Sequence, residues 1–167
     1  MILAMHFGPV ILNNTPLVAL WVLNRLDLLR SIYDVVYIPT AVQDEFLAVS
    51  REHRLQSLAQ SPWIQIAQLQ IPEYALTFPD LDLGEAEVLA LAVERSARLV
   101  IIDERKGRRY AKRLGLSVTG TLGVLLAAKA KGLIVNVAPM VDMLLENGIY
   151  LHPELVERAL QAAGETM

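Results

Sequence analysis

The stretch that decides the fold is LDLGEAEVLALAVERSARLVIID, residues 81–103. Asp82, followed three residues later by Glu85, predicts a capping box at the start of a helix that runs to about Ser96. The apolar, β-branched run Leu99–Ile102 then predicts a buried strand. A helix that leads directly into such a strand is typical of a parallel sheet, because parallel strands are joined by helical crossovers.

The same alternation of strands and helices extends in both directions from this stretch. The other predicted strands are Val10–Asn13, Val35–Ile38, Trp63–Ala67 and Leu116–Thr119, of which Trp63–Ala67 carries glutamines that favour an edge position. Helices are predicted after Thr15 as an N-cap, after Thr40 with Gln43 as a capping box, and over Glu104–Leu114, Leu122–Ala130, Met140–Glu146 and Pro153–Ala162. The segment Glu73–Leu83 reads as a loop. We therefore predict a three-layer α/β/α sandwich with a mainly parallel sheet of about five strands, formed by a single domain over residues 1–167.

Composition excludes several classes of protein. The 167 residues are 54% hydrophobic and contain no Cys, which excludes disulfide frameworks and thiol chemistry, and the 3 His are scattered without zinc-ligand spacing. The apolar N-terminal run Met1–Leu12 lacks a basic region and a cleavage site, so we expect it to lead into a buried strand. No segment reaches the roughly 18–20 apolar residues of a membrane span. We expect a cytoplasmic protein without membrane contact, and the apolar excess predicts a homodimer.

Acidic and amide side chains fall where ligands bind in parallel sheets, beyond the carboxyl ends of the strands. Glu85 shares its helix stripe with Val88 and is expected to point inward. Glu45 aligns with Ala41 and Ala48, a stripe of small residues that could pack closely on the sheet. The candidate side chains at this edge are Asn13, Asn14, Asp44, Glu45, Asp82, Glu85, Glu87, Asp103 and Glu104.

Some of these residues also have a purely structural interpretation. Asp82 and Glu85 form a capping box whatever else they do, Asp103 could cap the next helix, and Glu45 alone could be a solvated helix charge. Their joint position at one edge favours a shared role. Carboxylates that lie together raise one another's pKa, and a divalent cation with hard oxygen ligands, Mg²⁺ or Mn²⁺, removes that conflict. The chemistry this predicts is metal-assisted hydrolysis of a phosphodiester.

A dense basic run, residues 105–113, follows directly after these acids in a chain whose formal net charge is −3. At helical spacing one face collects cations that could follow a phosphate backbone, although a solvated helix face is the alternative. Tyr110 is the run's one aromatic residue, so base stacking is not indicated. The predicted nucleic-acid-binding residues are Arg105, Arg108, Arg109 and Lys112.

These motifs together resemble the PIN-domain proteins, and within them the DUF3368 group, which is akin to the toxin ribonucleases of VapBC-type toxin–antitoxin pairs. The resemblance covers nearly the whole chain. It is carried by NNTPLVAL (13–20), LDLGEAEVLALA (81–92), LVIIDERKGRRYAKRLGL (99–116) and VTGTLGVLLAAKAKGLI (118–134).

The resemblance implies a Mg²⁺ or Mn²⁺ site and cleavage of single-stranded RNA. By motif, the family's acids fall on Asn13, Glu45, Glu85, and Asp103 or Glu104, with Glu45, Glu85 and Asp103 as the catalytic residues. Thr119 and Thr121 fall at positions where a hydroxyl could hold a metal-bound water. At Asn13 the chain departs from the family, since an amide brings no charge and accepts no proton from water.

Two functions therefore compete. The first is a PIN-like, metal-dependent endonuclease for single-stranded RNA, paired with a small antitoxin protein. The second is a catalytically impaired PIN-like protein that binds nucleic acid or a partner without cleaving it, which the amide at Asn13 favours. A nucleotide-binding enzyme is disfavoured because no glycine-rich phosphate loop follows any predicted strand.

Overall fold

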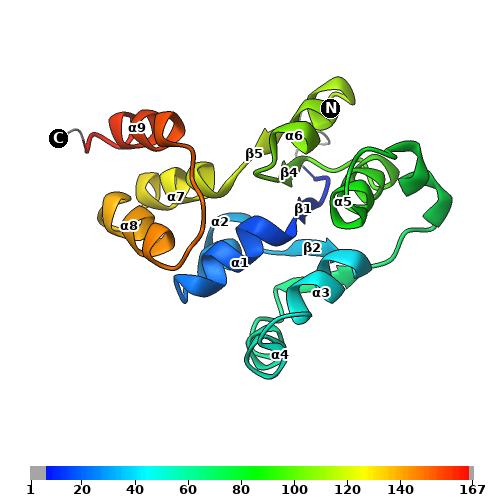
Figure 1. Cartoon of the computed structure of the whole chain (residues 1–167), viewed down its shortest axis with the longest axis horizontal. Helices are drawn as coiled ribbons and strands as arrows, with labels where there is room; N and C mark the ends of the chain where they lie inside the picture. The colour runs from blue at the N-terminus through cyan, green and yellow to red at the C-terminus, as the bar shows by residue number, and fades with distance from the viewer. Residues whose placement is uncertain (1–6, 166–167) are drawn as a thin grey trace.

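The computed structural model describes residues 7–165, with helices packed on both sides of a central sheet (Figure 1). The predicted lead-in of Met1–Leu12 lies outside the described residues as far as residue 6. The strands are β1 (Val10–Leu12), β2 (Val36–Pro39), β3 (Ile64–Ala67), β4 (Leu99–Ile101) and β5 (Val118–Thr119). The helices are α1 (Asn14–Val22), α2 (Asp27–Tyr33), α3 (Thr40–Leu47), α4 (Arg51–Ala59), the 3₁₀ helix η2 (Pro72–Thr77), α5 (Leu83–Glu94), α6 (Arg105–Arg113), α7 (Thr121–Ala130), α8 (Ala138–Glu146) and α9 (Pro153–Ala162).

The sheet has 5 strands in the order β3-β2-β1-β4-β5, and every pair is parallel. Strand β1 lies in the middle, where Ile11 pairs with Tyr37 of β2 on one side and with Val100 of β4 on the other. The chain builds outward from β1 through β2 and β3 and then returns to add β4 and β5. The α/β sandwich with a parallel sheet is confirmed, as is the edge position of β3. The reversal of direction at β1 is where such sheets place ligands.

Burial explains why the strands read as continuous apolar runs. Val10, Ile11 and Leu12 are all buried, because helices cover both faces of the sheet. Helix α5 packs against β1, β2 and β4, and it is buried almost throughout from Gly84 to Ala92. On the other side of the sheet, α7 packs against α1 and α2 (Figure 1). Within residues 7–165, no helix combines the length and the hydropathy needed to cross a membrane.

Several predicted helix starts were wrong, and for a common reason. Asn13, not Thr15, is the N-cap of α1, and its side chain does not cap the helix but donates through Nδ2 to Glu104. The predicted capping box of Thr40 with Gln43 is absent from α3. Its first-turn amide, Ala41 N, instead donates to Glu87 Oε1 of α5 at 3.0 Å. Side chains from distant elements can thus bond the free backbone amides at a helix start, which local rules assign to side chains nearby in the sequence.

Strand ends differ from the predicted ones by one or two residues, and the capping box of Asp82 and Glu85 is confirmed, although α5 ends at Glu94 rather than near Ser96. Sequence reasoning missed α2 and α4, and η2 occupies part of the segment read as a loop. Helix α4 has a polar sequence whose one buried side chain is Arg54. That guanidinium lies over the rings of Trp21 and Phe46, at 4.7 and 4.8 Å from their centroids. An arginine in an apolar position hides the periodicity that identifies a helix.

Candidate metal and nucleic-acid site

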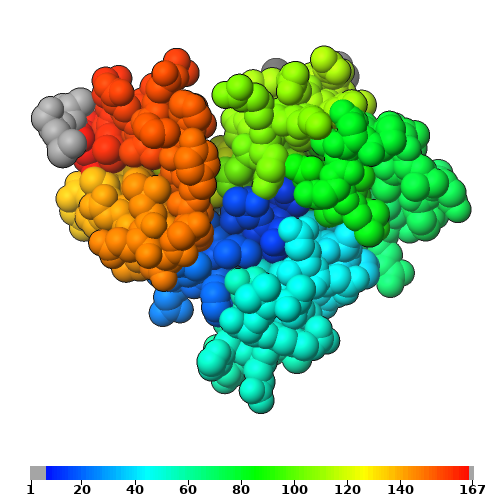
Figure 2. Space-filling view, viewed as in Figure 1, coloured from blue at the N-terminus to red at the C-terminus, as the bar shows by residue number. Residues whose placement is uncertain are grey.

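Side chains from separate chain segments meet at the carboxyl edge of the sheet. Asn13 follows β1, Glu45 lies on α3 after β2, and Glu104 follows β4. Figure 2 shows the blue atoms of the β1–α1 segment at the floor of a depression, bordered by the cyan atoms of α3 and the green atoms of α5 and α6. This placement agrees with the edge predicted from the strand ends.

Asn13 and Glu104 form the centre of this group. Asn13 is 3% exposed, and its Nδ2 donates to Glu104 Oε2 at 3.1 Å. Thr15 Oγ1 donates to the other oxygen, Glu104 Oε1, at 2.5 Å. The Oδ1 of Asn13 is buried and has no hydrogen-bond partner among the described residues. A buried carbonyl oxygen without a partner costs about 1–3 kcal/mol, so it marks a position where a donor or a cation is missing.

Glu45 approaches from α3. Its Oε2 accepts a hydrogen bond from Asn14 Nδ2 at 3.2 Å, and a Cβ placed on Gly84 would lie 2.8 Å from its Oε1. Glycine at the start of α5 therefore leaves room for this carboxylate. The pKa of Glu45 is raised, first by burial and then by Asp82 and Glu104. The expected packing of the stripe of Ala41, Glu45 and Ala48 on the sheet was wrong, because Glu45 and Ala48 are exposed and the buried face of α3 is Val42, Phe46 and Leu47.

Glu85 points inward, as its helix stripe predicts. It is 7% exposed, its backbone amide donates to Asp82 Oδ1 at 2.8 Å, and its Oε2 accepts from Asp82 N at 3.2 Å. A Cβ on Gly107 of α6 would lie 3.8 Å from Glu85 Oε1. Burial, then the charge of Asp82 and to a lesser extent that of Glu104, raise the pKa of Glu85 to about 7. The carboxyl thus exchanges a proton near neutral pH.

Asp103 and Glu104 point to different partners. Asp103 Oδ1 accepts from Thr121 N at 2.7 Å and its Oδ2 accepts from Thr121 Oγ1 at 2.6 Å, so this carboxylate holds the start of α7. Burial raises the pKa of Asp103 and the two bonds from Thr121 oppose that rise. The Thr119 side chain lies against Gly123 in the first turn of α7. Of the two neighbouring acids, Glu104 is the one that meets Asn13.

The donor set suits a hard divalent cation by its chemistry. Burial, and then the charges of Asp82 and Glu104, raise the pKa of Glu45 and of Glu85, and the unpartnered Asn13 Oδ1 adds a neutral oxygen to the carboxylates of Glu45, Glu85 and Glu104. In the described part of the chain, no three His or acidic side chains are already arranged around one metal position. The residues fit the ion by donor type and by charge.

The basic run forms α6, and its cations face different surroundings. Arg105, Arg109 and Lys112 are exposed, whereas Arg108 is half-buried and its Nη1 donates to Ile102 O at 3.0 Å. Arg108 therefore binds the backbone at the end of β4 through one nitrogen of its guanidinium. The other three extend into solvent beside the acids.

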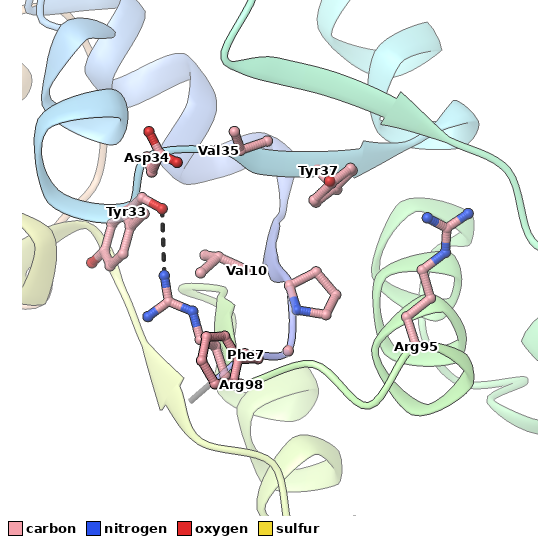
Figure 3. A pocket seen from close by; sticks show the side chains of 10 residues that line it. Phe7, Val10, Tyr33, Asp34, Val35, Tyr37, Arg95 and Arg98 are labelled. Atoms are coloured by element: carbon pink, nitrogen blue, oxygen red, sulfur yellow. Dashed lines mark hydrogen bonds between the residues drawn. The ribbon is translucent and has the colours of Figure 1, made fainter. Parts of the chain in front are cut away.

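A cavity of about 520 Å³ lies at the opposite edge of the sheet, among the amino ends of β1, β2 and β4. In Figure 3, Arg98 reaches the carbonyl of Tyr33 while Arg95 stands on the far side of the cavity, at the end of α5. None of the acidic residues described above lines it. The edge that carries the acidic group and the edge that carries this cavity are thus different.

Sequence reasoning missed one residue that belongs to the acidic group. Thr15 was interpreted as a helix cap, although its hydroxyl donates to Glu104. Asn14, which was among the candidates for this edge, donates to Glu45. No sequence signal distinguishes a threonine that caps a helix from one that contacts an acid 89 positions away. Asp82 was recognised as a cap, but its charge also raises the pKa of Glu45 and Glu85.

Comparisons with known proteins agree with this geometry. The model of the DUF3368 family, described as a PIN domain, matches residues 9–165. A search of curated proteins gives no significant match. The family match spans the sheet, the acidic edge and α6, so the chain belongs to the DUF3368 family of PIN domains, a nuclease-like family.

Proposed function

We propose that this chain is a Mg²⁺- or Mn²⁺-dependent endonuclease for single-stranded RNA, related in activity to the VapC-type toxins. The observation that carries the proposal is the buried, unpartnered Oδ1 of Asn13 beside Glu104. A carbonyl oxygen in that position, with carboxylates around it, is what a bound divalent cation would complete. Membership of a nuclease-like family supports the same conclusion.

The residues that would hold the ion are Asn13, Glu104, Glu45 and Glu85. Asp103 is assigned a positioning role, because Thr121 engages both of its oxygens. When bound, the metal lowers the pKa of a water molecule and offsets charge on the leaving oxygen. Asn13 and Thr15 orient Glu104, and Asn14 orients Glu45.

Glu85 would hold the ion through its Oε1. Its other oxygen, Oε2, accepts from Asp82 N, so the capping box fixes the carboxyl while leaving one oxygen for the ion. The cations of α6 would lie along the sugar–phosphate backbone, with Arg105, Arg109 and Lys112 as phosphate contacts.

We also propose a cytoplasmic homodimer that a small antitoxin protein controls. Large apolar side chains remain exposed on and around α8 and α9: Val135, Met143, Leu145, Tyr150 and Leu155. A stable interface buries more than about 1,000 Å² in total. Sedimentation at micromolar concentration tests this point, and a monomer would contradict it.

The experiment that tests the proposed activity is Asn13→Asp. The added carboxylate would supply the charge that the family's first acid carries, so Mn²⁺ binding and cleavage of a mixed single-stranded RNA should both rise about tenfold or more, at roughly 1.4 kcal/mol per decade. Asn136→Asp, an exposed position, adds the same charge away from the site and should change neither.

The opposite outcome supports the competing function. Asn13 is neutral, and no ready arrangement of three acids exists among residues 7–165, which favours a protein that binds RNA or a partner without cleaving it. In that case Asn13→Asp would lower the melting temperature at neutral pH, because the new charge sits unneutralised beside Glu104. A destabilised variant with no response to Mn²⁺ and no cleavage would refute the nuclease.

A further inference from the structure

A small pocket of about 110 Å³ lies on α6. Its lining residues are Asp80, Lys106, Arg109, Tyr110 and Arg113. The three cations are spaced three and four residues apart on α6, so they share one face of the helix. All three are exposed. This face is not the predicted one, with which it shares Arg109 alone.

One wall of the pocket is fixed by aromatic contacts. Tyr110 packs edge-on against the buried Phe78 with ring centroids 5.6 Å apart, and its hydroxyl donates to Asp80 Oδ1 at 2.7 Å. The guanidinium of Arg113 lies 5.8 Å from the centre of the Tyr110 ring. Because Phe78 and Arg113 both contact this ring, Tyr110 packs against other side chains of the protein rather than stacking on a base.

The pocket carries more positive than negative charge. Asp80 is its one acid, and Tyr110 already occupies one of its oxygens. Among the described residues, none of the three cations has a carboxylate oxygen within 4.0 Å. Three exposed cations around one partly engaged carboxylate form a site for a compact anion.

The pocket also adjoins the acidic group. Gly107, next to Lys106, is the α6 residue whose Cβ would lie 3.8 Å from Glu85 Oε1. Successive residues of a helix point about 100° apart, so the buried face of this turn meets Glu85 while its exposed face carries a wall of the pocket.

We propose that this pocket, the α6 phosphate pocket, binds one backbone phosphate of the RNA. The proposal rests on the proposed function and names how that site holds its substrate. A contact to phosphate fixes the register of the strand on the protein without reading its sequence. The same chemistry would also accept free inorganic phosphate, and the test separates the two.

The test compares Lys106→Ala/Arg113→Ala with the control Arg51→Ala/Arg158→Ala, which removes the same charge from exposed positions on α4 and α9. Binding of a labelled, mixed-sequence single-stranded RNA is measured against salt in EDTA, so that no cleavage occurs. The pocket variant should bind about tenfold more weakly, and the slope of log K against log salt should fall by about 0.7, the value for one lost phosphate contact on a single strand. The control should keep the wild-type slope.

Equal slopes and affinities for the pocket variant and the control overturn the proposal. Inorganic phosphate that competes with RNA on wild type but not on the pocket variant supports it, whereas phosphate binding without any effect on RNA shows a free-anion site and overturns the RNA assignment. Should the double variant melt early, Lys106→Gln alone replaces it, with a smaller expected loss. Slope loss without any cleavage by wild type in Mn²⁺ would refute the proposed nuclease and leave this pocket standing.

Discussion

Glu85→Gln offers the sharpest test of charge repulsion at the acidic edge. On folding, the pKa of Glu85 rises from 4.5 to about 7, mainly through burial and the nearby Asp82. Because the pKa is higher in the folded state, the contribution of Glu85 to stability is fully present below pH 4.5 and is lost as the pH rises through 7. Gln has no charge to lose, and its carbonyl oxygen still accepts from Asp82 N.

The size of the effect follows from that pKa. Ionising a carboxyl whose pKa rises from 4.5 to about 7 costs up to about 3.4 kcal/mol, and solvent screening at this open edge reduces our expectation to about 1–2 kcal/mol. Glu85→Gln should therefore melt about 3–6 °C above wild type at pH 8 and equal it at pH 4. Thermal unfolding in EDTA at both pH values measures this.

The control is Glu146→Gln, which removes an exposed carboxylate at the end of α8. It should leave the melting temperature nearly unchanged at both pH values. Adding Mn²⁺ should reverse the order at pH 8, because the ion would stabilise wild type more than the variant. A Glu85→Gln variant that is no more stable than wild type at pH 8 in EDTA would refute the raised pKa of Glu85 and its attribution to burial and repulsion.

Three further outcomes follow from contacts described above. Thr15→Val removes the hydroxyl that holds Glu104 and should lower stability by about 1 kcal/mol and weaken Mn²⁺ binding, which calorimetry would measure; unchanged affinity would deny Thr15 a positioning role. Gly120→Ala places a Cβ 2.5 Å from Asp103 Oδ1 and should destabilise by about 1–3 kcal/mol in urea unfolding, while an unaffected midpoint would contradict the close packing there. The pKa of Glu165 is lowered to about 2, first by Lys129 and then by backbone amides at the start of α8. The stability that its carboxylate contributes is therefore present above pH 4.5 and is lost as the pH falls toward 2. Glu165→Gln should lower the melting temperature at pH 7 but not at pH 2, and an equal loss at both pH values would refute this linkage.

The fold was predictable from the sequence because its main signals are local. The capping box of Asp82 and Glu85 and the apolar run at β4 depend on neighbours a few residues apart, and both appear as predicted. The inward direction of Glu85 follows from the helical period alone. The carboxyl-edge position of the acids follows from the parallel topology.

What could not be predicted depends on contacts between distant residues. The start of α3 is bonded by Glu87 from α5, and the start of α7 by Asp103, so local capping rules misassigned Thr40 and left the role of Asp103 open. The direction in which Glu104 turns is decided by Asn13 and Thr15, which lie far away in sequence. Periodicity carries no information on such pairs.

The central position of β1 also affects how the protein matures. A ribosome makes β1, β2 and β3 well before β4, yet β4 pairs directly with β1 and brings Glu104 to Asn13. A growing chain that ends before β4 holds Asn13, Glu45 and Glu85 but lacks Glu104, the acid at the centre of the group. If the group is the nuclease we propose, a product terminated before β4 is harmless to the cell's RNA.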